Sequence, residues 1–139
     1  MKRIIALICV LLIAVVVPPQ LQSAEDTKVI VYYFLTNFRC ASCHKIEKYT
    51  KEAVEQNFKD ELATGRLIFQ PINIDEKENQ HFIKNYQLYS KAVVLSMLTA
   101  EKEVKYKNLT KIWEYLGDKD KFYAYITSET SQFLEEANK

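Results

Sequence analysis

The chain has 139 residues, and its 19 lysines and arginines nearly balance its 18 aspartates and glutamates. The net charge of +1 leaves no basic excess of the kind with which nucleic-acid-binding domains hold phosphates, so we expect no nucleic-acid partner. The length fits one domain with its own core, and no internal repeat, low-complexity tract or Gly/Ser-rich linker divides it.

The first residues have the pattern of an export signal. Lys2 and Arg3 precede a run of fourteen apolar residues, 4–17, which suits a signal sequence and is short for a membrane span. Two prolines then end the run, and Ala24 offers a site for cleavage. Gln22, two residues before Ala24, is larger than the small residue that signal cleavage normally requires at that position. Retention of the segment as an uncleaved anchor is therefore an alternative.

This pattern divides the chain into two parts. Residues 1–24 are a signal peptide or an N-terminal membrane anchor, and residues 25–139 form a single domain. We therefore expect an exported protein, either periplasmic or anchored outside the cytoplasmic membrane, which contacts the membrane only if the segment is uncleaved.

Three cysteines are present, and Cys9 lies in the apolar run, where it lacks the small neighbours of a lipid-modified cysteine. Its loss with the signal leaves Cys40 and Cys43. A single pair so close in sequence cannot staple distant segments together, so stability must come from a hydrophobic core.

The domain opens with a nearly continuous run of Val, Ile, Tyr and Phe over residues 29–35, which predicts a central strand buried on both faces. Residues 36–39 connect it to a helix that Gly65 ends, with Glu47 and Lys51 as an ion pair one turn apart. Apolar residues follow this helix at helical spacing: Ile46, Ala53, Val54, Phe58 and Leu62.

Alternation and turn residues predict the remaining elements. In order, they are a strand over 67–75, a helix over 79–89 with Phe82, Ile83 and Tyr86 inward, strands over 92–98 and 103–109, and a last helix capped by Asp118 or Asp120. Pro71 lacks an N–H and so places the first of these strands at a sheet edge, whereas the other two form an antiparallel pair. The last helix turns Phe122, Tyr125, Ile126, Phe133 and Leu134 inward, and Trp113 packs beneath it. The order is βαβαββα.

Cys40-Ala41-Ser42-Cys43-His44 stands where the first helix begins. The free N–H groups and partial positive charge of a helix N-terminus stabilise a thiolate, and Arg39 and His44 add positive charge, so we expect the pKa of the Cys40 thiol below its usual value of about 8.5. Cys40 would then attack a disulfide and Cys43 would resolve the mixed disulfide. This predicts a protein thiol-disulfide oxidoreductase.

This element order, with C-x-x-C opening the first helix, resembles the thioredoxin fold, an α/β fold with a single central mixed sheet flanked by helices. A wider set of residues resembles the small exported proteins called nitrophenyl compound nitroreductase subunit, ArsF type. These residues are Tyr33-Phe34, Arg39-Cys40, Cys43, Ile46-Glu47, Ile72-Asn73-Ile74-Asp75, Asn79, His81-Phe82, Tyr86-Gln87-Leu88-Tyr89 and Val93-Val94-Leu95. That resemblance implies an arsenic or nitroaromatic setting and a membrane partner for thiol transfer or efflux.

The chain departs from thioredoxins at two places. Lys91, Ala92 and Val93 occupy the loop that faces the cysteines, where thioredoxins carry a cis-proline; without proline the bond is either trans or strained. The buried acid that accepts the proton of the resolving cysteine is replaced by an aromatic residue within 32–34. Proton transfer would then fall to His44 or water.

Other chemistries use the same residues. C-x-x-C-H is also an attachment signature for c-type haem, with Met97 as the other axial ligand, although so many strands fit a small cytochrome poorly. A metal held by Cys40, Cys43, His44 and His81, arsenite captured by the two thiolates, and a non-catalytic binding module or accessory subunit are further alternatives. We expect a monomer with no cofactor beyond a redox-active disulfide. Its partner is a protein thiol or disulfide, with a membrane electron donor or acceptor as a further candidate.

Overall fold

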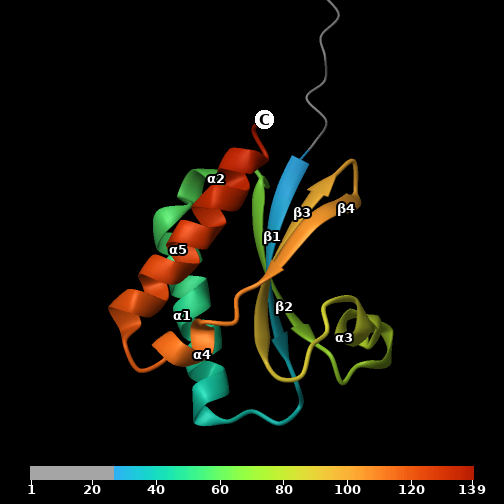
Figure 1. Cartoon of the computed structure of the whole chain (residues 1–139), viewed down its shortest axis with the longest axis vertical. Helices are drawn as coiled ribbons and strands as arrows, with labels where there is room; N and C mark the ends of the chain where they lie inside the picture. The colour runs from blue at the N-terminus through green and yellow to red at the C-terminus, as the bar shows by residue number, and fades with distance from the viewer. Residues whose placement is uncertain (1–26) are drawn as a thin grey trace, which may run out of the picture.

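The described residues form one mixed four-stranded sheet. Helices cover both of its faces (Figure 1). The computed structural model describes residues 27–139, so the predicted signal or anchor over 1–24 lies outside the described residues. The elements are β1 (Thr27–Leu35), α1 (Ala41–Asn57), α2 (Lys59–Ala63), β2 (Leu67–Asn73), the 3₁₀ turn η1 (Lys77–Asn79), α3 (His81–Asn85), β3 (Ala92–Thr99), β4 (Lys102–Asn108), α4 (Ile112–Tyr115) and α5 (Lys119–Glu136). Within 27–139 no helix combines the length and apolar character that crossing a bilayer requires.

The strands lie in the order β2-β1-β3-β4, with β1 parallel to β2 and antiparallel to β3, and with β3 antiparallel to β4. The expected central position of β1 and the expected antiparallel pair are both confirmed. In the described part of the chain β2 is an edge strand, as its proline predicted. The other edge, β4, carries a bulge: Glu103 pairs with Leu98 and Lys105 with Met97, so Val104 is the extra residue.

The apolar run of β1 is continuous because both faces of this strand are buried. Val29, Val31 and Tyr33 pack in the core that α1 and α5 cover. Ile30, Tyr32 and Phe34 pack on the opposite face, against the segment that contains α3. Full burial of a large apolar side chain contributes about 1.5–3 kcal/mol, so this strand anchors both layers of the domain.

The first predicted helix is divided. It ends at Asn57, and Phe58 adopts a non-helical conformation with φ −131° and ψ 44° before α2 begins. Phe58 is only 6% exposed, so the break turns its ring into the core. The chain leaves α2 at Gly65, whose φ of +75° favours glycine, and this expected stop is confirmed.

Three expectations about the later elements were wrong. The helix over 79–89 is reduced to a 3₁₀ turn and the five residues of α3, because Gln87 has a φ of 51° that no helix continues through. Ile83, expected inward, is 39% exposed. Trp113, expected beneath the last helix, is 44% exposed on the unforeseen helix α4. By contrast, Asp118 caps α5 as expected, accepting a hydrogen bond from Lys121 N at 3.1 Å.

Candidate functional site

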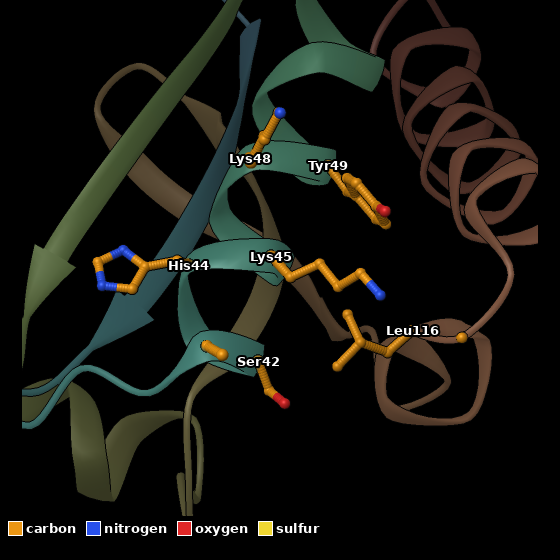
Figure 2. A pocket seen from close by; sticks show the side chains of 8 residues that line it. Ser42, His44, Lys45, Lys48, Tyr49 and Leu116 are labelled. Atoms are coloured by element: carbon orange, nitrogen blue, oxygen red, sulfur yellow. The ribbon is translucent and has the colours of Figure 1, made fainter.

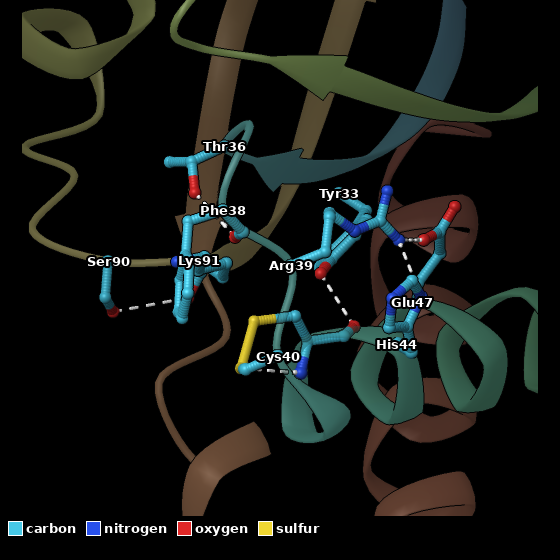
Figure 3. The surroundings of a disulfide bond; sticks show 10 residues. Tyr33, Thr36, Phe38, Arg39, Cys40, His44, Glu47, Ser90 and Lys91 are labelled. Carbon is cyan, nitrogen blue, oxygen red and sulfur yellow. Dashed lines mark hydrogen bonds and ion pairs between the residues drawn. A yellow bond between two sulfur atoms is a disulfide. The ribbon is translucent and has the colours of Figure 1, made fainter.

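The two cysteines form a disulfide at the N-terminus of α1 (Figure 3). Their Cα atoms are 5.1 Å apart. Cys40 is the N-cap residue, extended at φ −96° and ψ 169°, and its Sγ accepts a hydrogen bond from Cys43 N at 3.3 Å. The first turn of α1 contains no acidic residue that would offset the partial positive charge of the helix end. The leading sulfur therefore lies where a thiolate would be stabilised.

The two sulfurs differ in their access to solvent. Cys43 is fully buried in the core, whereas Cys40 is partly exposed. A partner thiol can thus approach the disulfide at Cys40 and not at Cys43. An attacking and a resolving cysteine would need such an asymmetry, and the two roles themselves stay a prediction.

Tyr33 fixes the turn that carries Cys43, a contact that the sequence analysis missed. Its hydroxyl donates a buried hydrogen bond to the carbonyl oxygen of Cys43 at 2.8 Å. Burial raises the pKa of Tyr33 to about 12; the nearby Arg39 opposes this rise and Glu47 adds to it. The hydroxyl consequently keeps its proton and remains a donor at neutral pH. In the sequence, Tyr33 was one aromatic residue within an apolar strand, so its polar end gave no separate signal.

Arg39 and His44, the two residues expected to tune the thiolate, lie together beside the disulfide (Figure 3). The Arg39 guanidinium forms an ion pair with Glu47 and lies 3.3 Å from Nδ1 of His44. The expected pair of Glu47 with Lys51 was wrong, because Arg39 reaches Glu47 from the loop before α1 and Lys51 lies instead 3.8 Å from Glu55.

Glu47 therefore changes the electrostatics that the sequence suggested. Its carboxylate offsets part of the Arg39 charge, although both side chains are more than a quarter exposed and solvent weakens the pair. Glu47 also lies one helical turn after Cys43. It is thus an acidic group near the cysteines in a fold whose usual buried acid is replaced here by an aromatic residue.

The loop at the usual cis-proline position lies on the other side of the disulfide from Glu47 (Figure 3). All peptide bonds in the described residues are trans. Ala92 and Val93 are buried at the start of β3, and Lys91 lies with its Nζ 5.4 Å from the ring centroid of Phe38. Large aromatic side chains are exposed in this region: Phe38 at 73%, Tyr89 at 95% and Trp113 at 44%. Tyr89, Lys91 and Trp113 line one shallow hollow, a surface suited to contact with a polypeptide.

The residues of the metal and haem alternatives are not assembled. His81 is exposed on α3, where its Nδ1 lies 2.7 Å from the carbonyl oxygen of Glu78. Between residues 27 and 139 no three His, Cys, Asp or Glu side chains gather in a group that could hold a metal ion. Met97 is buried in the core between the sheet and the α1–α5 layer.

A C-x-x-C pair that opens the helix after the central strand, on a βαβαββα core with strand order β2-β1-β3-β4, is the arrangement of a thioredoxin-like fold. No family model and no curated protein matches the chain.

Solved thioredoxins are structurally similar to it. A mutant thioredoxin from Halobacterium salinarum is 20% identical to this chain, with a TM-score of 0.43. The match covers 76% of this chain and 77% of that thioredoxin. The thioredoxin of Fasciola hepatica is 18% identical, with a TM-score of 0.38, and the match covers 65% of this chain and 79% of that thioredoxin. A mutant thioredoxin from Entamoeba histolytica is 21% identical, with a TM-score of 0.38, and the match covers 60% of this chain and 72% of that thioredoxin.

Proposed function

We propose that this protein is a thiol-disulfide oxidoreductase in which Cys40 exchanges with a protein partner and Cys43 resolves the mixed disulfide. The observation that carries the proposal is the asymmetry of the pair. Cys40 is partly exposed at the helix N-cap and accepts the Cys43 N–H, whereas Cys43 is fully buried. A purely structural bridge does not need one accessible sulfur held at a helix N-terminus.

The exchange can be written with its electrons balanced. A thiolate of the reduced partner attacks Sγ of Cys40, the Cys40–Cys43 bond breaks, and Cys43 leaves as a thiolate that takes up a proton. A second partner thiolate then attacks the partner sulfur of the mixed disulfide and releases Cys40 as a thiolate, which takes up the second proton; the two partner thiols gave up these protons when they ionised. The partner gains a disulfide, and this protein gains two electrons and two protons. Each step also runs in reverse, with Cys40 attacking a partner disulfide.

The setting of this chemistry is part of the proposal. The apolar run over 4–17 supports export, and an exported domain would exchange electrons with a membrane donor if it reduces its substrates or with a membrane acceptor if it oxidises them. The resemblance to ArsF-type subunits adds an arsenic or nitroaromatic setting to this proposal. The mass of the N-terminus of the protein recovered from the producing cells tests cleavage after Ala24, and fractionation of those cells tests the location.

The deciding experiment equilibrates the purified protein in glutathione and dithiothreitol buffers, alkylates free thiols and measures intact mass. We expect a reversible two-electron transition between about −270 and −120 mV, the range of such oxidoreductases. A pair that stays oxidised throughout would overturn the proposal and leave an inert bridge, and a haem-sized adduct would favour the cytochrome.

Two single variants then assign the roles. With a peptide disulfide as substrate, the Cys40 thiolate of Cys43→Ser should release one peptide thiol and accumulate a mixed disulfide, because the resolving thiol is gone. The matched variant Cys40→Ser should accumulate none because Cys43 is buried. Full activity of Cys43→Ser would instead support a binding module.

A further inference from the structure

A hollow of about 710 Å³ lies beside the redox pair, between α1 and the turn that joins α4 to α5 (Figure 2). Its α1 wall runs from Ala41, the neighbour of Cys40, to Tyr49, and Leu116 and Gly117 form the opposite wall. A helix rises 1.5 Å per residue, so this wall is about 12 Å long, enough for three or four residues of extended chain. We call this hollow the α1–α4 groove.

The α1–α4 groove has more positive than negative charge. Lys45 reaches toward Leu116 in Figure 2, and its Nζ has no carboxylate within ion-pair distance among the described residues, lying instead 5.7 Å from the centroid of an aromatic ring. Lys48 lies 3.8 Å from Glu52, but Lys119 is closer to that carboxylate at 3.1 Å. Two ammonium groups thus share the Glu52 carboxylate, and Lys45 adds a third positive charge with no carboxylate of its own among the described residues.

The same groove also offers an apolar surface, and one end of it lies at Ala41, the residue that follows Cys40. Leu116 and the ring of Tyr49 lie within its lining, and Ala41 places its end next to Cys40. The uncompensated N-terminus of α1 adds partial positive charge at that end. The groove would therefore select a segment of a partner protein by its charge, while the cysteine of that partner lies at the disulfide.

We propose that the α1–α4 groove binds an acidic segment that flanks the reactive cysteine of the partner protein, with Lys45 and Lys48 as the residues that select it. This inference rests on the proposed thiol-disulfide exchange and adds the chemistry by which a partner is recognised. Charge complementarity of this kind acts mainly on the rate of association, and salt screens it.

The test compares three peptides with one cysteine each, flanked on both sides by two glutamates, two glutamines or two lysines. The measured quantity is the rate at which each peptide thiol reduces the oxidised protein, followed by alkylation and mass. Each rate is divided by the rate of the same peptide with hydroxyethyl disulfide, a small neutral disulfide, because flanking charges alter thiol reactivity itself. We expect the glutamate peptide to exceed the lysine peptide by about ten-fold at low salt, and the ratio to approach one at about 0.5 M salt.

Charge-reversal variants locate the effect. The double variant Lys45→Glu and Lys48→Glu should lower the ratio at least ten-fold and bring it to one or below, and both side chains are exposed, so folding should be retained. The single variant Lys45→Glu should also lower the ratio, and its matched control Lys59→Glu makes the same charge change beyond the far end of α1 and should leave the ratio unchanged. Lys45→Arg keeps the charge and should keep the preference.

The outcomes separate this inference from the proposed function. If all three peptides and dithiothreitol exchange with the protein but their normalised rates agree, the groove does not select acidic partners and the oxidoreductase proposal stands. An equal loss of preference in Lys59→Glu would place the effect in overall charge and overturn the assignment to the groove. If dithiothreitol itself fails to reduce the pair, the proposed function fails.

Discussion

We expect the hydroxyl of Tyr33 to stabilise the turn that carries Cys43. It donates a buried hydrogen bond of 2.8 Å to the Cys43 carbonyl, and the whole Tyr33 side chain is 0% exposed. Tyr33→Phe removes this bond and leaves the ring in place. A buried hydrogen bond contributes about 0.5–1.5 kcal/mol, and the carbonyl keeps its helical partner, so we expect a loss of about 1 kcal/mol. For a domain of this size that lowers Tm by about 4 °C.

Urea and thermal unfolding of the oxidised protein, followed by circular dichroism, measure this loss. Tyr89→Phe is the matched control, because Tyr89 is 95% exposed and its hydroxyl should contribute almost nothing. If the free energy of unfolding of Tyr33→Phe lies within about 0.3 kcal/mol of the wild type, or if Tyr89→Phe loses as much, the bond does not hold the turn.

The same substitution has a signature at alkaline pH. Burial raises the pKa of Tyr33 to about 12, whereas a tyrosine in the unfolded chain ionises near 10. The folded state therefore keeps a proton that the unfolded state loses, so this contribution to stability is complete below pH 10 and is lost as the pH rises toward 12. The slope is about 1.4 kcal/mol per pH unit, and Tyr33→Phe should lose stability less steeply over this window. Burial and a hydrogen bond to Glu103 also raise the pKa of Tyr86, so part of the slope should remain.

Three further substitutions test other contacts. Glu47→Gln removes the carboxylate that offsets Arg39, so the leading thiolate gains stabilisation and the reduction potential should rise by about 10–30 mV in glutathione buffers. Glu103→Ala removes the acceptor of two hydroxyl groups, one of them on Ser96 at 1% exposure, and should lower the free energy of unfolding by about 2 kcal/mol in urea. Thr50→Val replaces a fully buried hydroxyl that has no hydrogen-bond partner in the described structure, and thermal unfolding should show a gain of about 0.5–1 kcal/mol.

Each of these substitutions has a control in the same chain. Glu55→Gln makes the same change further along α1 and should leave the reduction potential unchanged. If the potential of Glu55→Gln rises as much as that of Glu47→Gln, the rise does not depend on Arg39. Glu78→Ala changes an exposed carboxylate and should not lower stability, so a loss as large as that of Glu103→Ala would point to a general effect of charge. The Thr64 hydroxyl bonds to the Asp60 carbonyl at 2.9 Å, so a gain in Thr64→Val would contradict the reasoning for Thr50.

Much of the fold was predictable because its signals are local. The apolar run of β1, the Val- and Leu-rich run of β3 and the proline in β2 can each be recognised from a few neighbouring residues. The same holds for the cysteines. Cys43 follows Cys40 by three positions at the start of a helix, so both sulfurs lie on one turn. These features depend on periodicity and chain geometry, which do not require knowledge of distant segments.

The contacts that the sequence did not reveal join separate elements. The Tyr33 hydroxyl meets Cys43 only because α1 packs on that face of β1, and an apolar strand pattern does not indicate a polar contact at one ring. Glu47 had two basic residues within reach, and helical spacing favoured the wrong one. Trp113 was expected to be buried, whereas α4 turns it toward solvent, in the hollow that Tyr89 and Lys91 also line.

The two outer strands of the described sheet have a consequence for behaviour at high concentration. β2 carries Pro71, which has no N–H to offer a neighbouring strand. β4 carries a bulge at Val104, with Lys102, Lys105 and Lys107 along its length. Both features discourage edge-to-edge pairing, the route by which sheets of separate molecules join into aggregates. The proposed chemistry would form covalent links to partner proteins, and these two edges would keep such encounters from leading to polymerisation through the backbone.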